Sequence, residues 1–169
     1  TKDVWTHLVD IRKSFEPRAE ELAKKYALAP YTMFIGSGAL WGETILFSMC
    51  ILEEMQWKRT RYITSADFFH GTLELVEPDV PVFLFMGEDE NRKLDERVRA
   101  FLNRGVTGDT DINIIDTAEF AIPGLDDDFR VIVSPWILSA LTTDRLARNY
   151  ELVTKHNLKY RRYYHQFDY

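Results

Sequence analysis

The alternation of strand patterns with helix patterns is the feature that most restricts the fold of this chain. The run Tyr31–Ile35 is predicted to be a buried strand, because it is apolar and rich in residues that favour strands. Gly36, Ser37 and Gly38 follow as a tight turn, and residues 39–55 have the apolar spacing of a helix. This strand–turn–helix unit indicates a parallel sheet covered by helices.

The same alternation continues along the chain. Residues 4–26 are predicted to form one long or two short helices, with Pro17 placed to begin the second, and the other helices are expected over 91–103 and 135–154. We therefore expect a three-layer α/β/α sandwich with a five-stranded, mainly parallel sheet, in one domain over residues 1–155. The other four strands are expected at 61–64, 81–86, 111–115 and 130–133.

The last segment, 156–169, has too many aromatic residues for an ordinary solvated tail. We expect it to dock on its own domain or on a partner. Its basic residues Lys159, Arg161 and Arg162 could belong to a nucleic-acid patch, but anion-binding arginines on a packed tail are the favoured interpretation. The aromatic residues are Tyr160, Tyr163, Tyr164, Phe167 and Tyr169.

Length, charge and cysteine content restrict the class of protein. The chain has 169 residues, 46% of them hydrophobic and 28% charged, which is enough for one domain with a substantial core. Its net charge of −6 argues against non-specific binding to nucleic acid, which needs a concentrated cationic surface. No apolar run approaches the roughly 18 residues of a membrane span. With Cys50 as its single cysteine and no signal-peptide pattern, we expect a soluble protein of the cytoplasm that binds neither nucleic acid nor membrane.

No cofactor and no metal are expected. The turn at 36–38 lacks the longer glycine pattern of a dinucleotide site and the Lys-Ser/Thr ending of a P-loop. From its spacing alone, this turn is as well explained by a purely structural role as by contact with a ligand. The acidic run 126–128 lacks the pattern of a calcium loop and is interpreted as a solvated turn. The four histidines are scattered, at His7, His70, His156 and His165.

Glu54 and His70 are the candidates for acid–base chemistry. Glu54 is expected near the end of the helix 39–55, and His70 follows the strand 61–64 after a short turn. A carboxylate and an imidazole could together move a proton beside a carbonyl group. The residues alone favour simpler interpretations, namely a solvated carboxylate on a helix surface and a structural histidine.

Four short motifs together resemble the C-terminal half of the fructosamine-6-phosphate deglycases, which belong to the sugar isomerase (SIS) family. The related synthase of glucosamine 6-phosphate has Glu-Leu-Lys-His-Gly-Pro around its histidine, whereas this chain has Asp67-Phe-Phe-His-Gly-Thr72. The chain is therefore more similar to a deglycase, and the resemblance, which covers nearly all of it, implies a flavodoxin-like SIS domain. The motifs are Phe34-Ile-Gly-Ser-Gly38, Glu54-Met-Gln-Trp57, Phe68-Phe-His-Gly71 and Arg161-Arg-Tyr163.

The resemblance implies an activity and a set of site residues. The substrate would be a 6-phosphorylated fructosyl-amino acid, and the products would be glucose 6-phosphate and a free amino acid. Glu54 would act as the general base, and His70 would assist ring opening. The substrate-binding residues would be Gly36, Ser37, Gly38, Arg161 and Arg162.

The resemblance also implies an assembly. Family enzymes have two tandem SIS domains, and their phosphate-cradling loop lies in the first, so we expect this chain to be the C-terminal half of a longer enzyme. The active sites would be shared between the subunits of a homodimer, and the tail would dock near them. Two alternatives stay open: a phosphosugar-sensing SIS module of a regulator, and the isomerase half of glucosamine-6-phosphate synthase.

Overall fold

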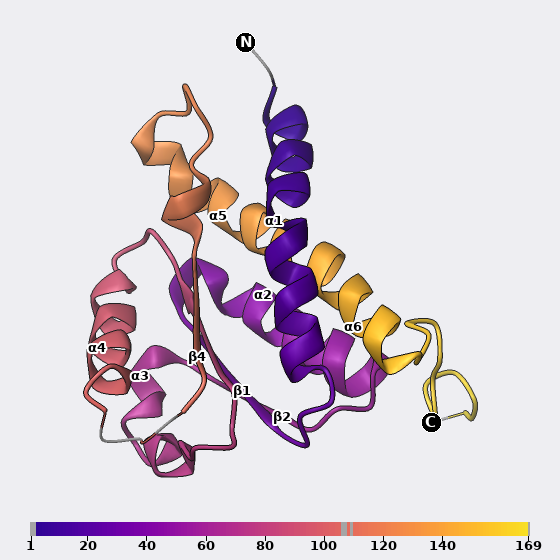
Figure 1. Cartoon of the computed structure of the whole chain (residues 1–169). Helices are drawn as coiled ribbons and strands as arrows, with labels where there is room; N and C mark the ends of the chain where they lie inside the picture. Colours follow the sequence, from indigo (N-terminus) through magenta and orange to yellow (C-terminus); the bar gives the residue numbers. More distant parts are fainter. Residues whose placement is uncertain (1–2, 106–107, 109, 169) are drawn as a thin grey trace.

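A four-stranded parallel sheet forms the centre of the molecule (Figure 1). The computed structural model describes residues 3–105, 108 and 110–168. The strands are β1 (Thr32–Gly36), β2 (Thr60–Ile63), β3 (Val82–Met86) and β4 (Ile112–Asp116), in the spatial order β2-β1-β3-β4. Their registers pair Thr32 with Thr60, Met33 with Val82, and Val82 with Ile112. These strands confirm the parallel α/β prediction.

One face of the sheet is covered by long helices (Figure 1). Helix α1 (Val4–Tyr26) is a single helix with Pro17 inside it, so the one-helix alternative holds. The stretch after β1 is helical from Gly38 to Met55, as a 3-10 turn (Gly38–Leu40), α2 (Trp41–Ile45) and a π-helical segment (Leu46–Met55). The last helical stretch consists of α5 (Arg130–Ser139), a π-helical segment (Ala140–Leu146) and α6 (Ala147–Thr154).

Shorter elements cover the other face. They are α3 (Ser65–Phe68), a 3-10 turn (Thr72–Leu75) and α4 (Arg92–Leu102). Two further 3-10 turns, Thr117–Phe120 and Asp127–Phe129, connect β4 to α5.

The alternation of side chains along the strands produces two apolar cores, one on each face of the sheet. Phe34, Phe83 and Phe85 point to the α1 side, and the rings of Phe34 and Phe83 stack with centroids 5.2 Å apart. Met33 and Leu84 are among the strand residues that point to the α3–α4 side, where they join Phe68, Val98 and Leu102. Helices on both faces of the sheet therefore give the expected three layers.

The fifth strand predicted at residues 130–133 is wrong, because this run is the start of α5. The run Arg130-Val-Ile-Val is rich in β-branched residues, which favour strands. Burial here follows the helical period instead: Val133, Ser134, Ile137 and Leu138 are buried, whereas Ile132 is exposed. Tertiary packing has overridden local strand preference.

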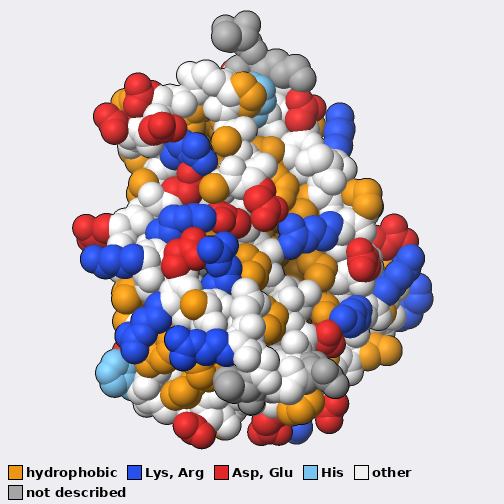
Figure 2. Space-filling view, turned by 60° about the vertical axis from the view of Figure 1, so that its left-hand side comes forward, with side chains coloured by type: hydrophobic (Ala, Val, Ile, Leu, Met, Phe, Trp, Pro, Cys, Tyr) orange, Lys and Arg blue, Asp and Glu red, His pale blue; other side chains and the backbone are white. Residues whose placement is uncertain are grey.

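The described residues include no helix that is both long enough and apolar enough to cross a membrane. On the face that includes α4, acidic and basic side chains lie next to one another (Figure 2).

Candidate functional site

Glu54 lies in a surface cavity of about 310 Å³ between the end of the 38–55 helical stretch and the tail. It is the second-last residue of the segment Leu46–Met55. Arg161 donates a hydrogen bond from Nε to Oε1 of Glu54 at 2.6 Å, so the two side chains form an ion pair. The side chain of Glu54 is only 34% exposed and that of Arg161 only 18%. The cavity is lined by Glu53, Glu54, Trp57, Lys58, Arg161, Arg162, Tyr163 and Tyr164.

Polar contacts hold the start of the tail to the end of that helical stretch. Gln56 is buried, donates from Nε2 to the carbonyl of His156 at 2.6 Å, and accepts from Thr154 Oγ1 at 2.7 Å. Leu158 packs in part against the α1-side core, whereas the tail aromatics Tyr160, Tyr163, Tyr164 and Phe167 are largely exposed. The tail therefore docks beside Glu54 through polar contacts at its start rather than through its aromatic rings.

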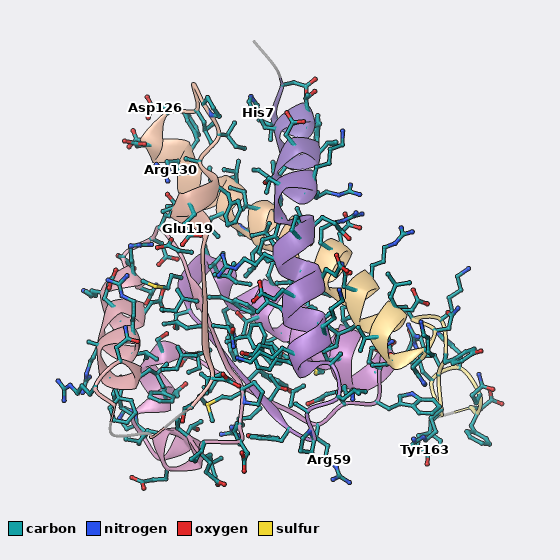
Figure 3. The ribbon with its side chains drawn as sticks, in the orientation of Figure 1. His7, Arg59, Glu119, Asp126, Arg130 and Tyr163 are labelled. Carbon is teal, nitrogen blue, oxygen red and sulfur yellow. The ribbon has the colours of Figure 1, made fainter. Side chains whose placement is uncertain are left out.

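Trp57 forms one wall of the cavity in an unusual backbone conformation. Its φ is 53°, a left-handed value that is uncommon for a large side chain. The guanidinium of Arg162 lies over the indole at 4.3 Å from the ring centroid, and the ring of His156 packs edge-on against it at 4.3 Å. These two contacts fix the indole between the helical stretch and the tail. Tyr163 lies on the loop at the end of the tail (Figure 3).

The turn Gly36–Gly38 is closed by a carboxylate of the same chain. Asp89 Oδ2 accepts a hydrogen bond from the backbone N–H of Ala39 at 2.5 Å. Gly38 has φ 55°, and a Cβ there would lie 2.1 Å from Asp89 Oδ2. Ser37 is buried and accepts a hydrogen bond from the N–H of Ser65 at 2.7 Å. An anion at this turn would meet the negative charge of Asp89, so the geometry does not favour the predicted substrate contacts of Gly36, Ser37 and Gly38.

His70 is exposed at the end of the α3 turn. Its Nδ1 lies 3.1 Å from the carbonyl oxygen of Ala66. Thr64 caps α3: its Oγ1 accepts from the N–H of Asp67 at 3.0 Å and donates to Asp67 Oδ2 at 2.7 Å. Asp67, which replaces the glutamate of the synthase motif, thus stabilises the turn that carries His70.

Within one chain, Glu54 lies near the edge of the sheet formed by the amino-terminal ends of the strands, and His70 lies near the edge formed by their carboxyl ends. Thr60, the first residue of β2, donates a hydrogen bond to Glu53 at 2.6 Å, which places the neighbouring Glu54 near the amino-terminal edge. His70 follows α3, which begins just after the carboxyl end of β2. A four-residue strand rises roughly 13 Å, which is far beyond hydrogen-bond reach. The single chain therefore does not bring the two residues together.

Asp95 is a buried residue of this region that the sequence analysis missed. It accepts from Ser65 Oγ at 2.5 Å and from the N–H of Gly87 at 3.3 Å, and so ties α4 to α3 and β3. Burial raises its pKa to about 6. The available signal was its place on α4, because Asp95, Val98 and Leu102 share the buried face of that helix. No group of three or more potential metal-binding side chains is present among the described residues.

Comparison with known proteins shows to which proteins the chain is related. No model of a protein family matches it. It is 30% identical over 155 residues to the fructosamine deglycase FrlB of Bacillus subtilis, covering 89% of this chain and 45% of that protein. It is 29% identical over 161 residues to the fructoselysine 6-phosphate deglycase of Escherichia coli, covering 94% of this chain and 43% of that protein.

Solved structures agree with this relationship. A crystal structure from B. subtilis, assigned as a phosphosugar isomerase, superposes with a TM-score of 0.89 at 27% identity, covering 97% of this chain and 49% of the other. The chain thus spans about half the length of the relatives it matches. It is therefore homologous to the fructosamine deglycase FrlB and to the fructoselysine 6-phosphate deglycases, and it has the fold of the SIS phosphosugar isomerases.

Proposed function

We propose that this chain provides the proton-transferring half of a deglycase that acts on 6-phosphorylated fructosyl-amino acids and releases glucose 6-phosphate and a free amino acid. The homology to deglycases supports the reaction class. The observation that carries the assignment is the position of Glu54, a carboxylate in a cavity formed by the tail, where Arg161 holds it in one orientation.

The proposed reaction is a proton transfer between neighbouring carbons. Ring opening, assisted by His70, exposes the C2 carbonyl of the sugar. Glu54 then removes a proton from C1 and returns it to C2 through an enaminol, while O2 gains a proton and the nitrogen loses one, which converts the ketone into a C1 imine with a hydroxyl group on C2. Water hydrolyses the imine to an aldehyde, glucose 6-phosphate, and the free amine of the amino acid. A positioned base of this kind contributes about 10²–10⁴-fold to the rate.

We further propose that each active site combines two copies of the chain in a homodimer. A base and an acid that act on one sugar must lie within a few ångströms of the same substrate, and in one chain Glu54 and His70 are separated by the length of β2. A twofold dimer could place the exposed His70 of one copy beside the Glu54 cavity of the other.

Arg161 and Arg162 are the proposed substrate-binding residues of the cavity, because both line it beside Glu54. The glycine turn at 36–38 is left out of this proposal, because Asp89 lies against it. The free thiol of Cys50 fits the cytoplasm, where we expect the reaction to take place.

The test introduces Glu54→Gln into the full-length enzyme, with Glu53→Gln as the matched control. Glu53 lines the same cavity but is hydrogen-bonded to Thr60, so its loss should cost less than tenfold. Glu54→Gln should lower the release of glucose 6-phosphate from a fructosyl-amino acid 6-phosphate by about 10²–10⁴-fold, because an amide cannot accept the proton. Equal turnover by Glu54→Gln and the unaltered protein would remove the proposed base, whereas no turnover by either would favour a sensing module.

The shared site is tested by mixing two inactive variants. Glu54→Gln and His70→Ala proteins should together recover about a quarter of the activity, because random exchange makes half of the dimers mixed and each mixed dimer has one intact site. Light scattering and exchange of labelled subunits verify the mixing. No recovery after verified exchange would contradict the shared site.

A further inference from the structure

Lys58 is a cavity-lining cation for which the described part of the chain supplies no carboxylate partner. It follows Trp57 at the end of the helical stretch, and its backbone N–H is bonded to the carbonyl of Leu52 at 2.8 Å. Its side chain is partly buried in the cavity wall, and this burial lowers the pKa of its ammonium group. A partly desolvated cation of this kind is stabilised when an anion binds beside it.

Among the other charged groups of the cavity, Arg161 and Glu54 neutralise each other, whereas Glu53 and Arg162 have no ion-pair partner among the described residues. Arg161 is paired with Glu54, and Glu53 accepts a hydrogen bond from Thr60. Arg162 has no carboxylate partner among the described residues and stacks on Trp57. A stacked guanidinium keeps its N–H donors free in its own plane, so it can still bind a carboxylate.

We propose that Lys58 and Arg162 form a carboxylate-binding site that recognises the α-carboxylate of the amino-acid part of the substrate and so favours sugars attached to an α-amine. The proposal rests on the proposed function and names the substrate class of that same cavity. Both cations line the cavity that contains Glu54, and the anion they bind must therefore lie close to the carbon from which Glu54 takes its proton.

The covalent structure of the substrate decides which anion this is. In an α-amine adduct, C1 is joined to nitrogen, the α-carbon and then the carboxyl carbon, so the carboxylate lies within about 4 Å of C1. The phosphorus on O6 lies roughly 8 Å away along the open chain. When lysine is attached through its ε-amine, the carboxylate is also several ångströms more distant. Two cations offset the repulsion between a carboxylate so near C1 and the negative charge of Glu54.

The test compares two ligands that differ in the carboxylate alone: fructosylglycine 6-phosphate, and the methylamine adduct, in which C1 of the same sugar phosphate carries a methylamino group in place of the glycine. For each, kcat/KM is measured from the release of glucose 6-phosphate. Lys58→Met and Arg162→Met should each lower kcat/KM about tenfold or more for the glycine adduct, which is the usual effect of losing a hydrogen bond to a charged group. For the methylamine adduct the change should stay within about threefold.

Arg59→Met is the matched control. Arg59 is the next residue in the chain, is exposed, lies outside the cavity lining and points away from the body of the molecule (Figure 3). For each ligand, kcat/KM should be the same with this variant as with the unaltered protein. Equal thermal melting of all variants shows that the folds are intact.

The outcomes separate the two proposals. Equal losses on both ligands would mean that the two cations bind the phosphate, and would overturn the carboxylate site while leaving the deglycase function standing. No loss on either ligand would overturn the site in the same way. If the full-length enzyme released glucose 6-phosphate from fructoselysine 6-phosphate but from neither of these two ligands, the carboxylate site would be overturned and the deglycase function would stand. Release from none of the three would overturn both.

Discussion

The buried carboxyl of Asp95 should make the stability of this fold fall as the pH rises from about 4 to 6. Burial raises the pKa of this group to about 6 in the folded chain, against an ordinary value of 3.8, although its hydrogen bonds from Ser65 and Gly87 oppose the rise. Between these two pKa values the folded chain keeps a proton that the unfolded chain has released. The contribution of this group to stability is thus largest below about pH 4, and it is lost as the pH rises through the folded pKa.

The size of the effect follows from the two pKa values. A difference of about two pKa units corresponds to about 3 kcal/mol of unfolding free energy lost between pH 4 and pH 7. This is a large share of the total stability of an ordinary domain, which is about 5–15 kcal/mol.

The assay is urea unfolding of Asp95→Asn and the unaltered protein at pH 4 and pH 7, followed by tryptophan fluorescence. Asparagine does not titrate. Its amide nitrogen, in the place of Oδ2, cannot accept the hydrogen bond from the Gly87 N–H. The loss of this bond is the same at both pH values and cancels in the difference. The unaltered protein should lose about 3 kcal/mol more than the variant between the two pH values. An identical pH dependence of the two proteins would refute this reasoning.

Ser65→Ala provides an independent check of the same reasoning. The hydrogen bond from Ser65 Oγ lowers the pKa of Asp95, so its removal should raise that pKa further. The loss of stability should then extend to a higher pH than in the unaltered protein.

Two other predictions concern the glycine turn and the tail. Gly38→Ala should destabilise the fold by more than about 1 kcal/mol in urea unfolding, because its φ of 55° disfavours a side chain and a Cβ would displace Asp89; stability equal to that of the unaltered protein would contradict the observed closure of the turn. Arg161→Met should make the tail more accessible to limited proteolysis after residue 155, because the ion pair with Glu54 is lost, while α1 stays protected; an unchanged cleavage rate would show that the tail is held by other contacts.

The four correctly predicted strands were identifiable from their local sequence, and two of them from their burial. β1 and β3 are buried on both faces and appear as uninterrupted apolar runs, which is the pattern of central parallel strands. The run at 130–133 has similar residues but belongs to a helix, because the packing of α5 against the rest of the α1-side core decides its conformation. That packing involves residues distant in sequence, which a local pattern does not contain.

The candidate site shows the same limit. The sequence located Glu54, His70 and the glycine turn in their structural elements, but the contacts that define their environments are long-range. Arg161 and Glu54 are 107 positions apart, and Asp89 and Ala39 are 50 positions apart. No spacing rule connects such pairs, so neither the ion pair beside the base nor the carboxylate against the turn was predictable.

The distribution of charge explains why an anionic substrate should bind at the amino-terminal edge of this sheet rather than at the carboxyl edge, where ligands of such folds usually bind. At the carboxyl edge, Asp89 accepts a hydrogen bond from the N–H of Ala39, directly after the glycine turn. Arg92 donates two hydrogen bonds to Asp116, and Arg130 is paired with Glu88. The two arginines there are thus already neutralised, and the carboxylates would repel a phosphate or a carboxylate. The cavity beside the tail keeps two cations without carboxylate partners among the described residues, together with the candidate base. An anion is therefore attracted more strongly to this cavity than to the carboxyl edge. For this reason the proposed reaction is placed in the cavity rather than at the usual ligand position of the fold.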